Sequence, residues 1–526
     1  MMNRFKSFGS SLCLIVATLV GVVVFERPSV PAEKIDFNYS LLGFQIQVED
    51  LAVFAETGEV SDSLNYYFRY ISPERTKKLR KFLQQSYDVN PVLVYRYSRT
   101  SVGVKMLQRI GEIIRLPGYL NGFYGLRAAV VQTAQSPEGI NLVDFLQRFP
   151  TDIQLDLGEL LQLMKQMSRA ESATKEFIAS IETEDVTASN NNEYLDLSQP
   201  GKYQAEKQTL ELYDAQRDRQ LNTDLYLPKN RTGAIPTVVV SNGLGAKRDR
   251  FAGLARYLVS YGYAVIIPDH PGSDRQRQKD FVRGLYQENF DATDFVDRPL
   301  DISFILDRLE ELNSRSFDNR LDLEEVGLFG YSIGGTTGLS LAGAKFDWEQ
   351  LEQDCAQPLN LTNISILYQC RALEIPRKYP SLKDDRIQAA YLFVPFGHSI
   401  FGKELQDDIS IPIMFQVVDQ DFLTSLLEEQ VPLFNSLAEN NYLVISEKLP
   451  HSSVTLSKEA QSSQAEAVKV AKTYQNILSL AFFQSYIAQD PDFLDCLTAE
   501  YLQAIAQEPY NLHLVRDRQS LGFLDD

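Results

Sequence analysis

Beyond residue 206, short apolar segments alternate with longer amphipathic ones, and this pattern restricts the fold more than any other feature of the sequence. The apolar segments are rich in β-branched residues, as strands are. They lie at residues 237–240, 264–267, 326–329, 389–394, 413–418 and 442–445, after a hairpin expected at 210–213 and 225–227. Helical stretches such as 251–261 and 300–311 separate many of them. Because strands that are apolar on both faces need cover on both, we expect a mostly parallel sheet between two layers of helices.

The chain before this part has a different spacing. Apolar and polar residues partly alternate over residues 37–48, and apolar residues then recur three and four positions apart, as at Leu142, Phe145 and Phe149. A polar, turn-forming stretch around an Asn-Asn-Asn run follows. Since one hydrophobic core rarely exceeds roughly 250–300 residues, we expect two domains in a chain of 526 residues. The predicted organisation is a mainly helical domain at 33–182, a linker at 183–206 and an α/β domain at 207–526 with an insertion near 345–385.

The first 32 residues have the features of an export signal. Arg4 and Lys6 precede an apolar run over residues 12–25, and Val30-Pro31-Ala32 offers small residues where a signal peptidase cleaves. The run is also near the lower length limit for a membrane-spanning helix. We therefore expect residues 1–32 to be a signal peptide or, as the alternative, an uncleaved membrane anchor. Both place the rest of the chain outside the cytosol, in the periplasm or the extracellular space, and the anchor would associate with the membrane.

Composition excludes two classes of partner. The formal net charge is -19 at pH 7, whereas nucleic-acid binding depends on clustered Lys and Arg, so we expect no nucleic-acid partner and interpret the acidity as a solubilising surface. The chain has four cysteines and four histidines, with no Cys-x-x-Cys pair and no His-Glu-x-x-His helix. We therefore expect no metal site.

Three cysteines lie beyond the export segment. Cys355 and Cys370 flank the predicted insertion, and an exported chain meets an oxidising compartment in which such pairs form disulfides. We predict a disulfide between these two residues. Two buried thiols are the alternative, and Cys496 is a competing partner.

A Gly-x-Ser-x-Gly motif carries the clearest chemical signal. The apolar segment 326–329 runs into Gly330-Tyr331-Ser332-Ile333-Gly334-Gly335, and small residues then begin a helix. A serine on a sharp strand-to-helix turn has a strained backbone and an exposed hydroxyl, and glycines two positions to either side avoid collisions. The motif alone also fits a glycine-rich turn. Its position after a strand in a series of βα units favours Ser332 as a nucleophile.

A serine nucleophile needs a base and an acid, and candidates for both follow it in the sequence. An imidazole must take the serine proton, and a carboxylate must hold that imidazole in the right tautomer. His451 follows the predicted strand 442–445, and Asp421, with Asp419 as the less favoured choice, follows the strand 413–418. The alternatives are that His451 is a surface residue and that the aspartates cap a helix. The other histidines fit the required place less well: His270, His398 and His513.

Charge that develops on a carbonyl oxygen needs backbone N–H donors. We expect one from Ile333, directly after the nucleophile, and another from Leu244 in the loop Asn242-Gly243-Leu244-Gly245. The same loop resembles a dinucleotide-binding turn, but Arg248 stands where that fingerprint has its third glycine. An oxyanion hole is therefore the better interpretation.

A set of longer segments points to a family. They are Ser241-Asn242-Gly243-Leu244-Gly245, Pro268-Asp269-His270-Pro271-Gly272-Ser273, Arg298-Pro299-Leu300-Asp301-Ile302, the serine motif, and the regions of Asp421 and His451. With these segments the second half of the chain resembles α/β-hydrolases related to platelet-activating factor acetylhydrolase and dienelactone hydrolase. Two positions depart from the pattern, since Asn242 stands where these relatives usually have His and Val418 replaces the Gly common before the acid. The first part, notably residues 32–35 and 121–127, is similar to an uncharacterised N-terminal domain attached to bacterial α/β-hydrolases.

The resemblance implies an α/β-hydrolase fold behind a mainly helical domain, and a carboxyl-ester hydrolase that acts on a small-molecule or lipid acyl ester without cofactor or metal. In such enzymes the acid usually lies three residues beyond a small residue at the strand end, which favours Asp421 over Asp419. An acyltransferase or thioesterase would use the same residues. The alternative from another class is an inactive hydrolase fold that serves as a binding module in the cell envelope, and the presence of all three triad residue types argues against it.

Overall fold

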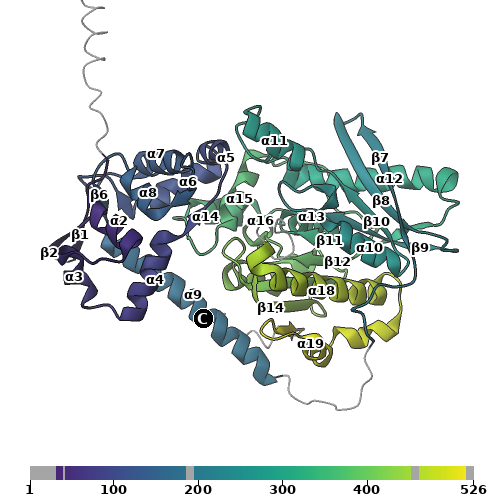
Figure 1. Ribbon diagram of the computed structural model, residues 1–526. Helices are drawn as coiled ribbons and strands as arrows, with labels where there is room; N and C mark the ends of the chain where they lie inside the picture. Colours follow the sequence, from purple (N-terminus) through teal and green to yellow (C-terminus); the bar gives the residue numbers. More distant parts are fainter. Residues whose placement is uncertain (1–30, 40–41, 185–194, 452–460, 517–526) are drawn as a thin grey trace, which may run out of the picture. The chain divides into compact units, whose positions relative to one another are not determined.

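The computed structural model describes residues 31–39, 42–184, 195–451 and 461–516 (Figure 1). Within these ranges the chain forms two compact units. The first comprises the described residues of 31–98 and Met106–Leu161, and the second Arg99–Lys105 and the described residues of 162–516. The predicted export segment lies outside the described residues except at its end. Within the described ranges, no helix is long and apolar enough to span a membrane.

The first unit combines helices with a small sheet. Its strands follow the order β2-β1-β6-β4, and a separate pair joins β3 to β5. The strands are β1 (Lys34–Tyr39), β2 (Leu42–Gln47), β3 (Ser86–Tyr87), β4 (Ile114–Arg115), β5 (Ile140–Asn141) and β6 (Ile153–Leu155). The helices are α2 (Val48–Thr57), α3 (Asp62–Phe68), α4 (Pro73–Gln84), α5 (Pro91–Tyr97), α7 (Phe123–Thr133) and α8 (Leu142–Gln147). Helix α6 (Ser101–Ile110) is divided between the units, since its residues up to Lys105 belong to the second. The unit is mainly helical, and much of the alternating pattern belongs to β2.

Local sequence explains where helices of this unit begin. Ser72 caps α4 and Asn90 caps α5 with their side chains, and each is followed by a proline at the first helical position. The core of the unit buries Phe149 and Ile153. Ala32 is buried in the same core, and its N–H donates to the carbonyl of Phe149 at 2.9 Å. Residue 32, which the sequence analysis assigned to the export segment, therefore belongs to the folded unit.

Helix α9 (Leu157–Glu184) runs from the first unit into the second. Its C-terminal part buries Phe177, Ile178 and Ile181 in the core of the second unit. The spacing of apolar residues predicts a helical domain that ends at residue 182, whereas the second unit already begins at Gln162. Helical spacing continues through this point without a break, so periodicity alone gave no sign of the change.

The second unit is built on a nine-stranded sheet with the order β15-β14-β13-β12-β11-β9-β10-β8-β7. Its strands are β7 (Ala205–Asp214), β8 (Arg219–Pro228), β9 (Ile235–Ser241), β10 (Ala264–Pro268), β11 (Leu321–Tyr331), β12 (Ile387–Phe393), β13 (Ile413–Gln420), β14 (Tyr442–Pro450) and β15 (Leu512–Val515). Six neighbouring strands pair in parallel: β14, β13, β12, β11, β9 and β10. At the edges, β15 pairs antiparallel with β14, β8 with β10, and β7 with β8. The predicted mostly parallel sheet is confirmed.

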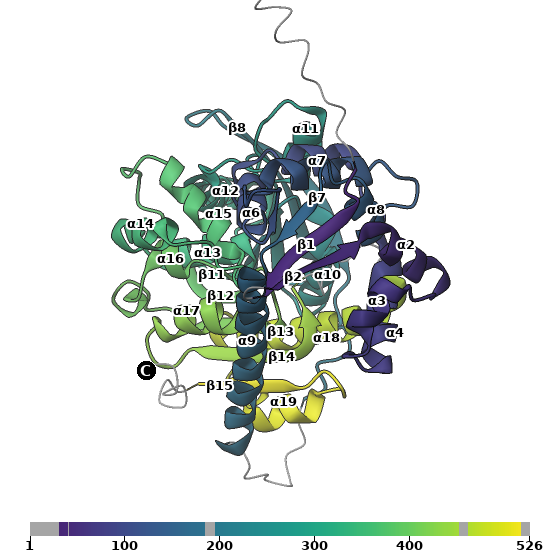
Figure 2. The same ribbon diagram turned by 90° about the vertical axis from the view of Figure 1, so that its left-hand side faces the viewer.

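Successive residues of the central strands face opposite layers. Val238 and Val240 of β9 pack into one core with α10 (Ala252–Ser260) and α18 (Gln461–Tyr486). Val239 packs into the other core with α12 (Asp294–Ser316) and α13 (Ile333–Ala342). This alternation is the period of two expected of a strand that is buried on both faces. Both helical layers can be followed in Figures 1 and 2.

Shorter helices fill the connections of the second unit. They are α11 (Arg275–Arg283), α14 (Trp348–Ala356), α15 (Ser365–Gln369), α16 (His398–Phe401), α17 (Val431–Asn435) and α19 (Ala499–Ile505). Irregular turns are η1 (Arg248–Phe251), η2 (Cys370–Glu374), η3 (Leu405–Asp407), η4 (Leu426–Gln430) and η5 (Pro491–Leu497). Helices α14 and α15 with η2 form the insertion expected near 345–385.

A disulfide closes this insertion. Cys355 in α14 and Cys370 at the start of η2 are bonded with an S–S distance of 2.01 Å, which is the pairing that the sequence analysis expected. Cys496, the competing partner, is a buried free cysteine.

Removal of this disulfide by the double change Cys355→Ser and Cys370→Ser is expected to lower the free energy of unfolding by roughly 3 kcal/mol, because the bond restricts a short loop of the unfolded chain. Denaturant titrations of the purified variant and the wild type measure the difference. A reductant should shift the wild-type midpoint and leave that of the double variant unchanged. Equal midpoints for both proteins without reductant would show that the bond contributes nothing.

Candidate active site

Ser332 lies on a sharp turn between strand β11 and helix α13. Its backbone has φ 55° and ψ −119°, a conformation that is strained for any residue with a Cβ. The flanking glycines make the turn possible. A Cβ on Gly330 would collide with the carbonyl of Gly334, and one on Gly334 would collide with the carbonyl of Ser241. The geometry is that of a nucleophile elbow, the turn that the motif predicted.

Asp421 and His451 form a hydrogen-bonded pair at the ends of neighbouring strands. His451 Nδ1 lies 2.7 Å from Asp421 Oδ2, and Asp421 is only 6% exposed. The carboxylate also accepts the backbone N–H groups of Leu423 and Thr424 at 2.8 and 2.9 Å and the Thr424 hydroxyl at 2.6 Å. These donors hold the acid in place. With Nδ1–H donating to Asp421, Nε2 of His451 is left as an acceptor.

Asp419, the rival acid, does not take part in this pair. It belongs to strand β13, and one of its carboxylate oxygens is buried without a hydrogen-bond partner among the described residues. Burial raises the pKa of Asp419 to about 6. Strand β13 ends at Gln420, so Asp419 lies within the strand and Asp421 directly beyond its end.

His451 lies beside the serine turn. The hydroxyl of Tyr331, the residue before Ser332, donates to the carbonyl of His451 at 3.3 Å, and the two rings have centroids 5.6 Å apart. No hydrogen bond joins the Ser332 side chain to His451, both of which the structure describes. Such catalytic hydrogen bonds often tighten only when substrate binds. Tyr331 thus holds His451 next to the Ser332 turn.

The expected oxyanion donors are free to bind. Ile333 is the first residue of α13, where a backbone N–H has no partner within its own helix. Leu244 lies in the loop after β9, and neither N–H donates to another group in the parts of the chain that the structure describes. Helix α13 also directs the positive end of its dipole toward the serine turn.

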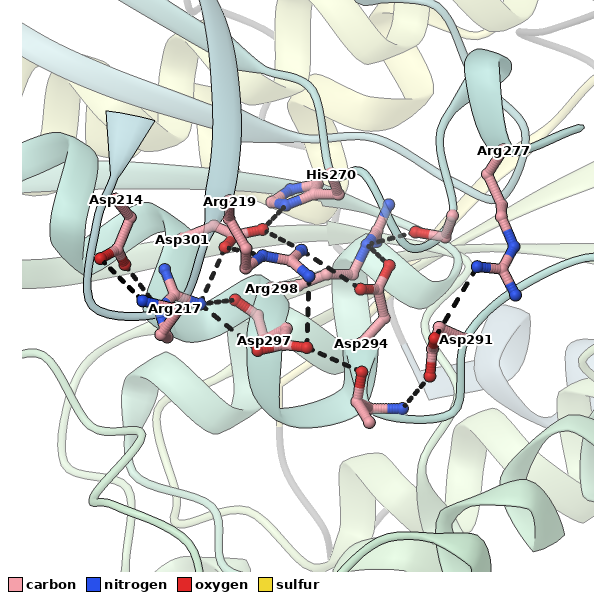
Figure 3. Close-up of polar contacts among 12 residues, drawn as sticks. Asp214, Arg217, Arg219, His270, Arg277, Asp291, Asp294, Asp297, Arg298 and Asp301 are labelled. Carbon is pink, nitrogen blue, oxygen red and sulfur yellow. Dashed lines mark hydrogen bonds and ion pairs between the residues drawn. The ribbon is translucent and has the colours of Figure 1, made fainter. Parts of the chain in front are cut away.

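A cluster of buried charged residues lies next to this loop (Figure 3). Asp301 accepts two hydrogen bonds from Arg219, each of 2.8 Å, and lies 3.1 Å from His270 Nδ1. His270 Nε2 in turn lies 3.3 Å from the hydroxyl of Ser241. Burial, with the nearby charge of Arg298 as a second cause, lowers the pKa of His270 to about 4, so its ring is neutral at neutral pH. The ring donates to Asp301 and accepts from Ser241.

Two further members of the cluster are buried ionisable residues. Arg298 is 1% exposed and Asp294 is fully buried, and Arg298 Nε lies 3.8 Å from an Asp294 oxygen. Burial lowers the pKa of Arg298 to about 10, which leaves it charged at neutral pH, and raises the pKa of Asp294 to about 7. In the sequence, Arg298 and Asp301 stand out only as parts of a motif, and His270 only as part of a motif and as a histidine that fits the base position less well. The available signal was a pair of charged residues three positions apart at the start of the predicted helix 300–311, since charges on a buried helical face need partners.

A cavity of about 760 Å³ borders the acid loop in the second unit. Asp421 lines it, whereas Ser332 and His451 are not among the described residues that do so. Its apolar walls come from Met164, Met167, Ala170, Ile178, Phe422 and Leu426. Phe422 is 64% exposed, which is high for an aromatic side chain. Helix α9 therefore supplies one wall of an apolar cavity beside the candidate acid.

The two remaining histidines each contact an acidic residue. His513 pairs with Glu447 at 2.6 Å, and the backbone N–H of His398 donates to Glu429 at 2.8 Å. Among the described residues, no group of three or more His, Cys, Asp or Glu side chains has a metal-binding arrangement.

Comparison with known proteins agrees with the fold. Residues 31–156 match a family model described as "Alpha/beta hydrolase of unknown function (DUF1400)", and residues 236–347 match one described as "alpha/beta hydrolase fold". A search of curated proteins finds no match to the chain. The chain has the α/β-hydrolase fold, with the N-terminal unit that the first model covers. The matches support hydrolase activity in general terms and do not point specifically to platelet-activating factor acetylhydrolase or dienelactone hydrolase.

Proposed function

We propose that this protein is a serine hydrolase that cleaves carboxylic esters. The observation that carries the proposal is the strained Ser332 turn, with the Asp421–His451 pair held beside it through Tyr331. A serine hydroxyl is a weak nucleophile, and a neutral imidazole oriented by a carboxylate is the group that activates it.

In the proposed reaction the Ser332 oxygen attacks the ester carbonyl carbon while its proton passes to Nε2 of His451. The resulting oxyanion is stabilised by the N–H groups of Ile333 and Leu244. The C–O bond to the alcohol then breaks, and the alcohol leaves with the proton from His451. Water attacks the acyl-enzyme in the same way and releases the carboxylic acid. Asp421 keeps the imidazole in the tautomer that both steps need.

The proposed substrate is an ester with an apolar group, and a lipid acyl ester fits this description. The methionine-rich wall of the cavity beside Asp421 supports this class, because flexible Met side chains adapt to apolar chains of different shape. The resemblance to acetylhydrolases of lipid esters points the same way. Export to the periplasm or the extracellular space is also part of the proposal and rests on residues 1–32 alone.

A fluorophosphonate probe tests the chemistry without knowledge of the natural substrate. The probe phosphonylates only an activated serine, so the wild-type protein should be labelled at Ser332 and the Ser332→Ala variant should not. A panel of p-nitrophenyl esters of increasing acyl length then defines the substrate class. A folded wild type that resists the probe would contradict the proposal and favour a binding module, whereas labelling without ester hydrolysis would favour transfer to another acceptor.

A further inference from the structure

The loop that carries Leu244 is held at three points by groups that do not touch the reacting atoms. The Ser241 hydroxyl binds His270, as described above. The carbonyl of Asn242 accepts from Nη2 of Arg298 at 2.7 Å. The N–H of Gly245 donates to the carbonyl of Ser273 at 2.7 Å. The N–H of Leu244 therefore lies between two fixed peptide groups.

Arg298 joins this loop to a second one. Its Nε donates to the Ser273 hydroxyl at 3.0 Å, while its Nη2 holds Asn242. Ser273 itself donates its N–H to the carbonyl of His270 at 2.9 Å. One planar guanidinium thus sets the distance between the loop at 241–245 and the loop at 270–273. We call Arg298 and Ser273, with the two loop segments that they connect, the loop clamp.

The buried acids of helix α12 hold the clamp in place. Asp294 and Asp301 lie before and after Arg298 on the helix, and Asp301 is fixed to strand β8 by Arg219. A Cβ on Gly272 would collide with the carboxylate of Asp294, so the second loop lies directly against this acid. Arg has the donor geometry for two directed hydrogen bonds at once, which Lys lacks.

On its other side the loop packs against the serine turn. A Cβ on Gly243 would come within 2.7 Å of the Tyr331 ring, and one on Gly334 would collide with the Ser241 carbonyl. The distance from the Leu244 N–H to the Ser332 turn is therefore fixed from both directions, by contact on one side and by the clamp on the other. Donors aimed in advance at the developing oxyanion stabilise the transition state more than the bound ester.

We infer that Arg298 is a positioning residue for the oxyanion hole, acting through the main chain of Asn242 to Gly245. This inference rests on the proposed function, since it assigns the Leu244 N–H to an oxyanion. Loss of the clamp lets the loop relax and misplaces one donor. The chemical step then slows, while binding of the ester in its ground state changes little.

Three variants test the loop clamp by removing successively fewer of its interactions. Arg298→Met removes both hydrogen bonds and the charge, and Arg298→Lys keeps the charge and one donor. Ser273→Ala removes the hydroxyl that accepts from Arg298 and that also hydrogen-bonds to Asp294, and it leaves Arg298 bound to Asn242. We expect kcat to fall about a hundredfold, about tenfold and about threefold, respectively, with KM within about twofold of wild type, because one misplaced donor costs up to roughly a hundredfold. The partial recovery by Lys relative to Met separates a positioning role from a mere loss of packing.

Arg320→Lys is the matched control. Arg320 donates to the carbonyl of Arg231 at 2.9 Å near the opposite end of strands β9 and β11, so it is also an arginine that ties one loop to another. Its replacement should lower thermal stability and leave kcat unchanged.

Binding of a trifluoromethyl ketone provides the second readout. Addition of Ser332 to its carbonyl creates an oxyanion, so its inhibition constant should rise in each clamp variant by the factor by which kcat/KM falls. Folded Ser273→Ala and Arg298→Lys proteins with wild-type kcat and inhibition constant would overturn the inference, even if Arg298→Met does not fold. A wild type that is neither labelled by fluorophosphonate nor active on esters would overturn the proposed function and this inference with it.

Discussion

Replacement of Ser332 by Ala is expected to lower kcat for ester hydrolysis by about five to six orders of magnitude, and replacement of His451 by Ala to have a similar effect. Triad members act as a unit, because the serine without its base is as unreactive as the base without its serine. The double variant should therefore be no worse than either single one. Hydrolysis of a short-chain p-nitrophenyl ester measures the loss.

Ser314→Ala is the control for this series, since Ser314 is an exposed serine on helix α12. It should keep wild-type kinetics. The Ser332→Ala protein should unfold at a temperature equal to or above that of the wild type, because alanine replaces a catalytic hydroxyl that no hydrogen bond to His451 holds in the free protein. Wild-type kinetics in a folded Ser332→Ala or His451→Ala protein would show that the chemistry lies elsewhere.

Asp421→Asn is expected to lower kcat by up to about ten-thousand-fold. The amide oxygen can keep the backbone hydrogen bonds from Leu423 and Thr424, but the amide nitrogen then faces Nδ1 of His451 and donates to it. The ring is forced into the tautomer with its proton on Nε2, and it can no longer take the proton of Ser332. The fold should be little affected, since the side chain keeps its size.

Asp419→Asn is the matched variant, two residues away in the same segment. Burial raises the pKa of Asp419 to about 6, so the fold disfavours the charged form there relative to water. A neutral amide should therefore be accommodated, and we expect kcat to stay within about tenfold of wild type. Both variants are compared by kcat over pH 5 to 9 with thermal unfolding as a check. Equal losses at the two positions would point to a structural role, and a severe loss only at Asp419 would contradict the assignment of the acid.

The sequence predicted the central strands and the serine turn because both depend on short-range chemistry. Alternation of apolar strands with helices determines a parallel sheet. The glycines around Ser332 are needed because a side chain at either position would collide with nearby backbone, and the motif itself predicts this requirement. The order of Asp421 and His451 after consecutive strands then follows from the topology. Strand β15 was not predicted, since its four residues lie at an edge and are too few to show a period.

The buried charged cluster is the part of the site that the sequence pattern did not predict. Arg219 lies on β8, His270 follows β10, and Asp301 lies on α12, so they meet only after the sheet has formed. Each residue taken alone is an ordinary polar residue near a loop. They are buried together only through tertiary contacts, which neither the hydrophobic periodicity nor the secondary-structure propensity of the sequence can predict.

Helix α9 makes the hydrolase unit inseparable from the segment before it. Phe177, Ile178 and Ile181 are core residues of the second unit, although they precede residue 183, where the sequence predicted a linker to begin. A protein that inherited only residues 207–526 would lack three buried apolar side chains, each of which stabilises a core by roughly 1.5–3 kcal/mol. Gene fusion or domain exchange at the start of residues 207–526 would therefore yield a marginally stable protein, and a lineage that recombines this unit with other partners must carry the helix along.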